Sequence, residues 1–319
     1  MTSTTSYPSG SPTGIVERSL DAGAHGGNAS ILPLVCRWPQ SGKIKGIVLF
    51  CHGLSASGRD YAELSRHWAA HGYLVIHPTF PDWIGAVAKA EPDLRLDPDG
   101  DLTGWPNDAT ARQRMYEILH SPSYWFERIR IVRQVMAGLD GILESTCGSP
   151  AAPVQCAIAG HSFGAYTSQL FAGAEIDVPG EGVRNFRDDR FAAAILLSAQ
   201  GRDQQGLREG SWDAITGPML NVTGTLDGGA KGQDWHWKVE PYEFAPAGAK
   251  YLAVLSDADH YLGGIARTDQ SPVPNQRDAV EQLTLAFLDA FVSGDATAKA
   301  WLDTVSDSVG TCPVLFRRK

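Results

Sequence analysis

The sequence predicts an α/β fold in which helices cover both faces of a mostly parallel central sheet. Short apolar runs alternate with amphipathic helical patterns from about residue 28 onward. Several of the runs are continuously apolar, as is typical of parallel strands that are buried on both faces. With 319 residues, of which 43% are hydrophobic, the chain can form a large core.

Each expected strand is a short apolar run that ends near a turn signal. The expected strands are residues 31–38, 46–53, 73–78, 154–162, 191–199, 218–224 and 250–258. Helical spacing predicts helices over residues 61–72, 125–143 and 279–294. In the last of these, one face carries Val280, Leu283, Phe287, Leu288 and Phe291, and the pattern ends at Gly294.

We expect one α/β domain over residues 14–319, because no repeat or low-complexity linker divides the chain. Residues 1–13 are polar and predict a disordered N-terminal tail. Residues 81–125 are rich in Pro and Asp and are too long for an ordinary connection. They form either a lid-like excursion with structure of its own or a solvated loop. We favour the lid, because long loops over this edge of a sheet often carry function.

Charge and composition limit the partners and the location. The net charge of −9 argues against nucleic acid or an anionic membrane as the main partner. No apolar run approaches the roughly 20 residues of a membrane span, and the N-terminus lacks the pattern of a signal peptide. We therefore expect a soluble, cytoplasmic protein without stable membrane insertion, although a removed leader would leave no trace. The five cysteines have no metal-like spacing, and the sequence does not specify an oligomeric state.

Ser162 lies in a Gly-x-Ser-x-Gly peptide, Gly160 to Gly164, between an apolar strand and a helical segment. This strand-turn-helix context is that of a nucleophile elbow. A Cβ atom at either glycine would collide with the neighbouring strand or helix, so the turn can be tight enough to lift Ser162 above the sheet edge. An ordinary serine in a glycine-rich loop is the alternative, which the flanking strand and helix make the weaker interpretation.

A serine hydroxyl needs a base, and His260 is the best placed of the nine histidines. It follows the last expected parallel strand and precedes the C-terminal helix, where the chain order serine, acid, histidine requires the base. His161 adjoins Ser162, but we expect it to pack beside the turn. The alternative for His260 is a solvated surface histidine.

The imidazole in turn needs a buried carboxylate to hold its tautomer. Asp227 comes just after the strand at 218–224 and lies between the serine and the histidine in chain order. Asp257 and Asp259 compete with it, but they are so close to His260 along the chain that a contact with the ring is harder to form. We therefore prefer Asp227 as the acid.

Two backbone N–H groups are candidates for an oxyanion hole. Phe163 follows the serine directly, and Leu54 follows the His52-Gly53 dipeptide at the end of the strand at 46–53. Donors placed where negative charge develops can each lower an activation barrier by about 3 kcal/mol. His52 and Gly53 alone would indicate no more than a turn. The serine, the histidine, the aspartate and this dipeptide indicate an active site only together, and each lies at the C-terminal end of an expected strand.

These segments together resemble the α/β-hydrolases, most closely the group of plasma-type platelet-activating-factor acetylhydrolases and dienelactone-hydrolase-like esterases. The resemblance covers roughly residues 30–295 and rests on "VLFCHGLSASGRDYAEL", "WFERIRIVRQVMAGLD", "AGHSFGAYTSQL", "FAAAILLSAQG", "PMLNVTGTLDGG" and "DADHYLGG". It implies Ser162 as nucleophile, Asp227 as acid, His260 as base, and Leu54 and Phe163 as oxyanion donors. The chain departs from dienelactone hydrolases proper, whose nucleophile is a cysteine, and residues 81–125 match no pattern of the group.

The sequence thus predicts a serine carboxylic-ester hydrolase that forms an acyl-enzyme from small to medium apolar esters, without a metal or an organic cofactor. An acyltransferase or amidase with the same triad, and a non-catalytic binding protein with a hydrolase-like shell, are the alternatives. The tryptophans that could line an apolar substrate pocket, or could equally be core and loop-anchoring residues, are Trp83, Trp105, Trp125, Trp235 and Trp237.

Overall fold

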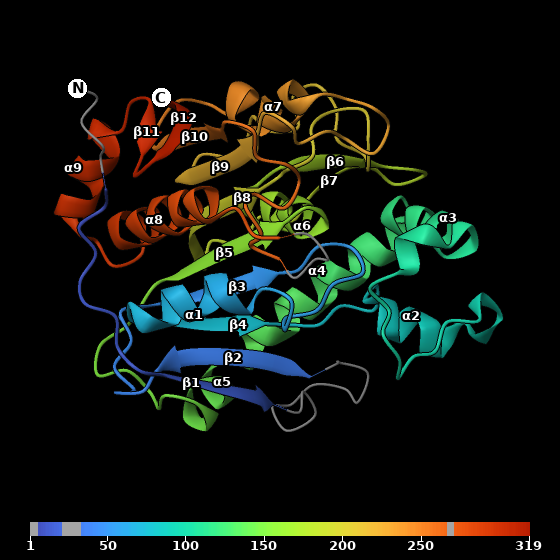
Figure 1. The fold of residues 1–319 in the computed structure, drawn as a ribbon, viewed down its shortest axis with the longest axis horizontal. Helices are drawn as coiled ribbons and strands as arrows, with labels where there is room; N and C mark the ends of the chain where they lie inside the picture. Colours follow the sequence, from blue (N-terminus) through green and yellow to red (C-terminus); the bar gives the residue numbers. More distant parts are fainter. Residues whose placement is uncertain (1–5, 21–32, 267–270) are drawn as a thin grey trace.

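The computed structural model describes residues 6–20, 33–266 and 271–319. Within these residues a ten-stranded mixed sheet crosses the molecule (Figure 1). In the order in which they lie side by side, its strands are β1 (Ile15–Leu20), β2 (Leu34–Pro39), β4 (Tyr73–His77), β3 (Gly46–Cys51), β5 (Cys156–His161), β8 (Phe191–Leu197), β9 (Met219–Gly224), β10 (Lys250–Leu255), β12 (Cys312–Arg318) and β11 (Ser308–Val309).

The strands from β4 to β10 pair in parallel, so their C-terminal ends meet at one edge of the sheet. Strands β2 and β1 on one side, and β12 and β11 on the other, are antiparallel. Along the chain, β3 leads to its neighbour β4, and β5 then pairs on the opposite side of β3. In parallel α/β sheets, ligands bind at the carboxyl ends of the strands beside such a reversal of strand order.

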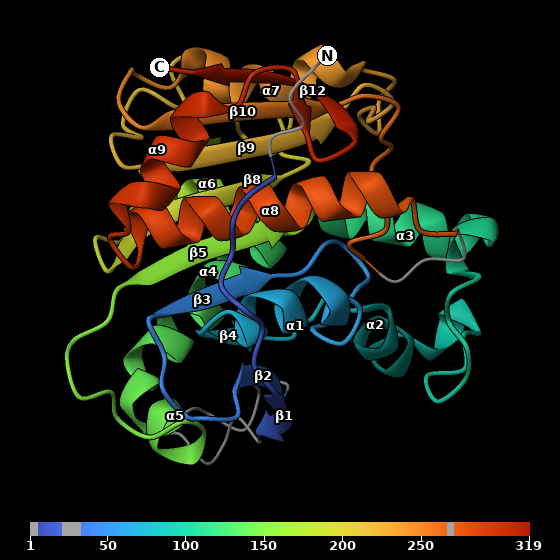
Figure 2. The ribbon, with the colours of Figure 1, turned by 60° about the vertical axis from the view of Figure 1, so that its left-hand side comes forward.

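Helices cover both faces of this sheet, as the sequence predicts (Figure 2). On one face the helices are α1 (Ala62–Ala70), α8 (Pro274–Phe291) and α9 (Ala296–Thr304). On the other they are α4 (Pro122–Ala137), α5 (Leu139–Ser145), α6 (Phe163–Ala172) and α7 (Trp235–Phe244). The apolar face expected for the C-terminal helix is the buried face of α8, where Val280, Leu283, Phe287 and Leu288 are fully buried.

Five strands and one helix break were not expected. These strands are short or partly polar and lack the continuous apolar pattern by which strands are recognised in the sequence. They are the edge strands β1, β11 and β12 and the separate hairpin of β6 (Glu175–Val178) and β7 (Gly182–Asn185). The single helix expected over residues 125–143 is wrong. It is divided into α4 and α5 at Gly138, a residue with a low helix propensity.

The described part of the N-terminal segment differs from the disordered tail expected over residues 1–13. Residues 1–5 lie outside the described residues, but residues 6–13 follow the helical face formed by α8 and α9 (Figure 2). The Tyr7 hydroxyl donates a hydrogen bond of 2.7 Å to Asp289, and the Tyr7 ring lies 5.0 Å from that of Trp301. Tyr7 is the one large aromatic side chain of a polar segment, and its contacts hold the described part of the segment against the helices.

Residues 81–125 form a structured excursion that projects from the sheet edge (Figure 1), so the alternative of a solvated loop is wrong. The excursion contains α2 (Ile84–Ala90), α3 (Ala109–Leu119) and 3₁₀ turns at Pro92–Leu94 and Trp105–Asn107. The side chains of its own small core are Ile84, Val87, Met115 and Ile118. Arg114 on α3 binds both carboxylate oxygens of Glu91 after α2, which ties the two helices together.

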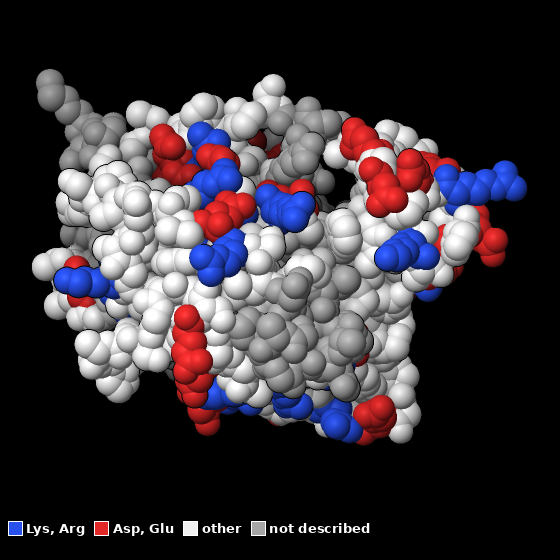
Figure 3. Space-filling model, turned by 90° about the horizontal axis from the view of Figure 1, so that it is seen from below, with Lys and Arg blue, Asp and Glu red and all other residues white. Residues whose placement is uncertain are grey.

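Charged side chains of both signs are interspersed on the face of the molecule seen in Figure 3. Among the described residues, no helix combines the length and the apolar character that a membrane crossing requires.

Met115→Ala tests whether the excursion has a core of its own. Met115 is fully buried, and truncation of a core methionine costs about 2–5 kcal/mol. We expect hydrogen exchange to become faster across residues 84–119 while β5 keeps its protection. Tyr116→Ala on the exposed side of the same helix is the control, since Tyr116 is 37% exposed. Equal exchange in the two variants would contradict an independent core.

Candidate active site

Ser162 occupies a sharp turn between β5 and α6. Its φ of 54° lies in the left-handed region, which is uncommon for a residue with a side chain. The turn is held by hydrogen bonds from the Ser162 N–H to the Leu197 carbonyl (2.9 Å) and from the Tyr166 N–H to the Ser162 carbonyl (3.0 Å). Strain of this kind persists only where the surrounding structure enforces it.

The two glycines of the turn are required by close backbone contacts. A Cβ atom at Gly160 would overlap the backbone of Gly164, and a Cβ atom at Gly164 would overlap the carbonyl of Cys51 at the end of β3. No side chain could move to relieve these overlaps, because the neighbouring atoms belong to the backbone. The expected steric role of both glycines is therefore present in the structure.

The structure brings Ser162, His260 and Asp227 together in one hydrogen-bonded chain. His260 Nε2 lies 3.0 Å from Ser162 Oγ, and His260 Nδ1 lies 2.9 Å from Asp227 Oδ1. The other carboxylate oxygen of Asp227 accepts a 2.8 Å hydrogen bond from the Thr223 hydroxyl. Ser162 follows β5, Asp227 follows β9 and His260 follows β10, so parallel strands of one sheet deliver the three residues to the same edge.

The competing acids do not contact the His260 ring. Asp257 is exposed, and its N–H donates to the Thr225 hydroxyl. Asp259 accepts a hydrogen bond from the backbone N–H of Tyr261 and so closes a turn. Both residues shape the loop, as is common for Asp in turns.

Asp227 is fully buried and charged. Burial acts to raise the pKa of its carboxyl, but Lys238 and then His260 outweigh burial and hold that pKa well below its ordinary value. The Lys238 ammonium lies 3.6 Å from Asp227 Oδ1 and is itself buried. Burial lowers the pKa of Lys238, and the attraction of Asp227 offsets part of that effect.

Sequence reasoning did not identify Lys238 or Ser198. The Ser198 hydroxyl lies 2.8 Å from His260 Nδ1 and accepts a 3.0 Å hydrogen bond from Lys238 Nζ. Ser198 directly follows β8, which lies between β5 and β9, so its position at a strand end was a usable signal. Lys238 carried no comparable signal, because nothing in the sequence shows that its helix turns a lysine inward.

The two expected oxyanion donors lie on either side of the turn. Leu54 follows β3, the neighbour of β5, and Phe163 is the first residue of α6. Among the described residues, neither backbone N–H donates to another protein group. Unpaired N–H groups beside a serine hydroxyl can receive a developing oxyanion.

His52 fixes the loop that carries Leu54. Its Nε2 atom accepts from the Phe80 N–H (2.8 Å), so Nδ1 carries the proton and donates to the Gly53 carbonyl (2.7 Å). This pattern requires a neutral ring. Burial, together with the nearby Arg128, lowers the pKa of His52 to about 4.

His161 connects the Leu54 loop to the histidine of the triad. Its Nε2 donates to the backbone carbonyl of His260 (2.7 Å), which leaves Nδ1 to accept from the Tyr61 hydroxyl (2.9 Å). The Tyr61 oxygen accepts in turn from the Gly53 N–H (3.0 Å). His161 thus packs beside the turn, as expected, and couples the positions of both loops.

A buried ion pair lies beneath the Leu54 loop. Arg128 on α4 binds both oxygens of Asp82, at 2.9 and 2.6 Å, and donates to the His52 carbonyl at 2.9 Å. Its guanidinium stacks between the rings of Phe80 and Phe163, at 4.3 and 4.1 Å. The pair therefore fixes both segments that carry the candidate oxyanion donors.

Two of the five tryptophans lie near the Leu54 loop. Trp83 and Trp105 are partly buried and pack against the core of the excursion, as Leu54 does. Partly buried Leu94, Leu96, Leu102 and Tyr124 pack against the same core. This part of the excursion presents apolar surface beside Leu54.

The other three tryptophans have anchoring contacts. Trp125 is buried and donates to the Leu119 carbonyl (2.9 Å), and Trp237 donates to the Arg202 carbonyl (2.8 Å). Trp235 packs partly buried against the core and stacks on His236. These contacts are those of loop-anchoring side chains.

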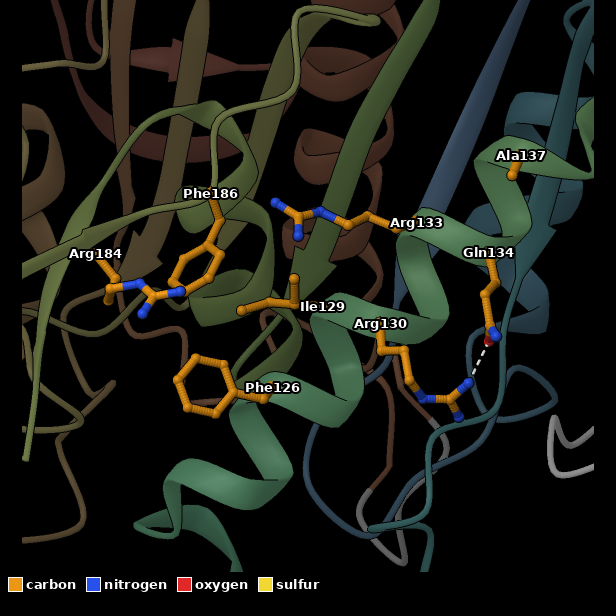
Figure 4. Close-up of a pocket in the computed structure, with 8 residues that line it drawn as sticks. All are labelled: Phe126, Ile129, Arg130, Arg133, Gln134, Ala137, Arg184 and Phe186. Atoms are coloured by element: carbon orange, nitrogen blue, oxygen red, sulfur yellow. Dashed lines mark hydrogen bonds between the residues drawn. The ribbon is translucent and has the colours of Figure 1, made fainter. Parts of the chain in front are cut away.

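A cavity of about 390 Å³ opens between α4 and β7, and none of the three residues of the triad lines it (Figure 4). Its lining residues are Phe126, Ile129, Arg130, Arg133, Gln134, Ala137, Arg184 and Phe186. Within the described part of the chain, no group of three His, Cys, Asp or Glu side chains is arranged to hold a metal ion.

The protein has an α/β architecture with helices on both faces of a mostly parallel sheet. A serine, a histidine and an aspartate meet at the carboxyl edge of that sheet. No family model and no curated protein matches the sequence.

Arg128→Met tests the buried ion pair. The substitution leaves Asp82 as a buried unpaired charge, so we expect the free energy of unfolding to fall by about 3–5 kcal/mol. Replacing both partners, as Arg128→Met with Asp82→Leu, removes the unpaired charge and should restore part of that loss. Urea denaturation measures both changes. A double variant less stable than the single variant would contradict this account.

His161 makes stability depend on pH. Burial and the nearby His260 lower the pKa of His161 to about 3, whereas an unfolded histidine titrates near 6.5. As the pH falls, the His161 ring therefore binds a proton in the unfolded chain before it does so in the folded protein. The free energy of unfolding has its full value above about pH 6.5 and decreases progressively as the pH falls toward 3.

Replacing His161 with Asn should flatten the pH dependence of the free energy of unfolding by up to about 1.4 kcal/mol per pH unit. The measurement is urea denaturation between pH 4 and 7, values that bracket the upper part of this window. His236→Asn is the control, because the His236 side chain is 66% exposed. The same slope in wild type and the His161 variant would refute a neutral buried ring.

Proposed function

We propose that the protein is a serine carboxylic-ester hydrolase with an α/β-hydrolase fold. The observation that carries the proposal is the hydrogen-bonded chain from Ser162 through His260 to the buried Asp227. A hydroxyl in contact with an imidazole, which is itself oriented by a carboxylate, is the arrangement that activates serine for attack on an acyl group.

The first half of the reaction forms an acyl-enzyme. Ser162 Oγ attacks the acyl carbon while His260 Nε2 takes the hydroxyl proton, and the carbonyl oxygen becomes an oxyanion held by the N–H groups of Leu54 and Phe163. His260 then gives its proton to the departing alcohol oxygen as the carbon–oxygen bond to the alcohol breaks. Asp227 stabilises the transient imidazolium and keeps Nδ1 protonated.

The second half repeats these steps with water. His260 Nε2 takes a proton from a water molecule, whose oxygen attacks the acyl carbon. The second oxyanion occupies the same two N–H groups. His260 returns the proton to Ser162 Oγ as the ester bond to the enzyme breaks, and the carboxylic acid leaves.

We propose small to medium apolar esters as the substrates. Support comes from the partly buried apolar side chains of the excursion beside Leu54, which include Trp83, Trp105 and Tyr124. Such side chains can hold an apolar acyl or alcohol group near the serine, because burial of apolar surface is favourable and non-directional.

Ser162→Ala and Asp227→Asn test the assignment with p-nitrophenyl esters of short and medium chain length. We expect kcat to fall by about 10⁴-fold or more in each variant, since one loses the nucleophile and the other the carboxylate that orients the base. Thermal unfolding should show that both variants remain folded.

Asp234→Asn is the matched control for the acid. Asp234 also pairs with a histidine, His236 at 3.1 Å, but both side chains are largely exposed. This variant should keep full activity. Full activity in Ser162→Ala would overturn the nucleophile, and full activity in Asp227→Asn would give the acid role to Asp257 or Asp259.

The competing activities are separated in the same assay. Matched p-nitrophenyl amides are supplied as alternative substrates to the esters. Alcohols are added as acceptors that compete with water for the acyl group. Faster amide cleavage would indicate an amidase, and a dominant ester product from the alcohol would indicate an acyltransferase. No turnover of any acyl substrate, with Ser162 unreactive toward a fluorophosphonate, would favour a non-catalytic binding protein.

A further inference from the structure

Lys238 and Ser198 form a buried bridge on the side of His260 opposite Ser162. The Ser198 oxygen lies 2.8 Å from His260 Nδ1 and 3.0 Å from Lys238 Nζ. The ammonium and the imidazole are therefore less than about 6 Å apart, joined by one oxygen atom. Neither residue is needed to form the chain from Ser162 to Asp227.

Ser198 is held in place by its backbone. Its φ of 55° lies in the left-handed region, its N–H donates to the Val222 carbonyl (2.8 Å), and the residue is fully buried. A lysine ammonium only donates hydrogen bonds, so the Ser198 oxygen accepts from Lys238. The same ammonium lies 3.6 Å from Asp227 Oδ1. The bridge therefore joins Lys238 to both the acid and the base.

Lys238 reaches this position from α7. Its neighbour Trp237 anchors the helix to Arg202, and the Lys238 carbonyl accepts from the Asn221 side chain on β9 at 2.9 Å. A buried ammonium is costly unless a partner compensates its charge. The carboxylate that pairs with it is that of Asp227, at 3.6 Å.

The charge of Lys238 matters for the base. Alone, a buried carboxylate would favour the protonated imidazolium of His260, which cannot accept the proton of Ser162. A second, positive charge beside the same carboxylate opposes that effect. At this separation, a charge displaces the titration of a neighbouring group within a protein by about one pH unit or more.

We propose that Lys238, bridged by Ser198, is a positioning residue that offsets the charge of Asp227 and keeps His260 in its neutral, proton-accepting form to lower pH. The proposal rests on the esterase function proposed above. It adds that activity extends further into the acidic range than a triad without this lysine would allow.

The other titratable groups around His260 do not supply this charge. His161, whose ring is 4.9 Å from that of His260, stays neutral because burial and His260 lower its pKa to about 3. Asp259 and Asp257 on the same loop are acidic, and Asp259 bonds the Tyr261 N–H. The Tyr261 ring lies 5.6 Å from the His260 ring and carries no positive charge. Among the residues that the structure describes, Lys238 is the cation in this environment.

The test is the pH dependence of kcat/KM in Lys238→Met, which keeps most of the length of the side chain and removes its charge. Without the ammonium the imidazolium is favoured, so the acid limb should move to higher pH by about one unit. Above that limb, kcat should remain within about tenfold of wild type and KM should be unchanged, since the triad contacts persist. Lys238→Gln is the second variant and should give the same displacement.

Lys250→Met is the matched control. Lys250 is also fully buried and donates to the Gly248 carbonyl (2.7 Å), but it begins β10 at the opposite edge of the sheet. This variant should leave the acid limb in place even if it lowers the melting temperature. If folded Lys238→Met or Lys238→Gln keeps the wild-type limb, or if Lys250→Met moves it equally, the proposal is overturned and Lys238 is structural only.

A second readout separates this proposal from the esterase proposal. The rate at which a fluorophosphonate labels Ser162 depends on the neutral imidazole but requires no ester turnover. If wild type labels but hydrolyses no ester, the esterase proposal fails, and the displacement of the labelling profile in Lys238→Met decides the role of Lys238. If wild-type Ser162 neither labels nor turns over, both proposals are overturned.

Discussion

The turn at Ser162 is the constraint on which the site depends. A serine with φ of 54° is held between a strand and a helix that approach so closely that Gly160 and Gly164 admit no side chain. Because β5 is flanked by parallel neighbours, the residues after β3, β8, β9 and β10 reach the same edge. The Ser162 hydroxyl, the His260 imidazole, the Asp227 carboxylate and the N–H groups of Leu54 and Phe163 meet at this edge because of this single arrangement of strands.

Buried charge is compensated twice around this edge, and each time the ion pair fixes a segment of the candidate site. The pair of Arg128 and Asp82 lies beneath the Leu54 loop, and Lys238 faces Asp227 behind the triad. The neutral rings of His52 and His161 link the same loops by further hydrogen bonds. In each ring one nitrogen donates and the other accepts. So many buried, hydrogen-bonded polar groups beside the Ser162 hydroxyl fix the positions of the surrounding loops closely, since each unmade hydrogen bond would be costly.

The sequence was sufficient for the fold class and for the residues that meet in the triad, because both follow from local patterns. Apolar runs mark the parallel strands, and Ser162, Asp227 and His260 each lie in the turn or loop after one of them. The edge strands and the fixed position of Tyr7 were missed, since their stability comes from packing that a local pattern does not encode. The helix break was missed although the low helix propensity of Gly138 is a local signal. Lys238 and Arg128 were missed for the same reason. A charged residue on an amphipathic helix normally faces solvent, and only the tertiary structure shows that these two turn inward to meet Asp227 and Asp82.

Trapping of the acyl-enzyme tests the central claim most directly. The protein would be mixed briefly with excess p-nitrophenyl ester, quenched in acid and digested, and its peptides analysed by mass spectrometry. The account predicts one acyl group per chain, on the peptide that contains Ser162, and none in a His260→Ala variant treated in the same way. Ester turnover with the acyl group on another residue, or equal acylation of Ser162 without His260, would contradict it.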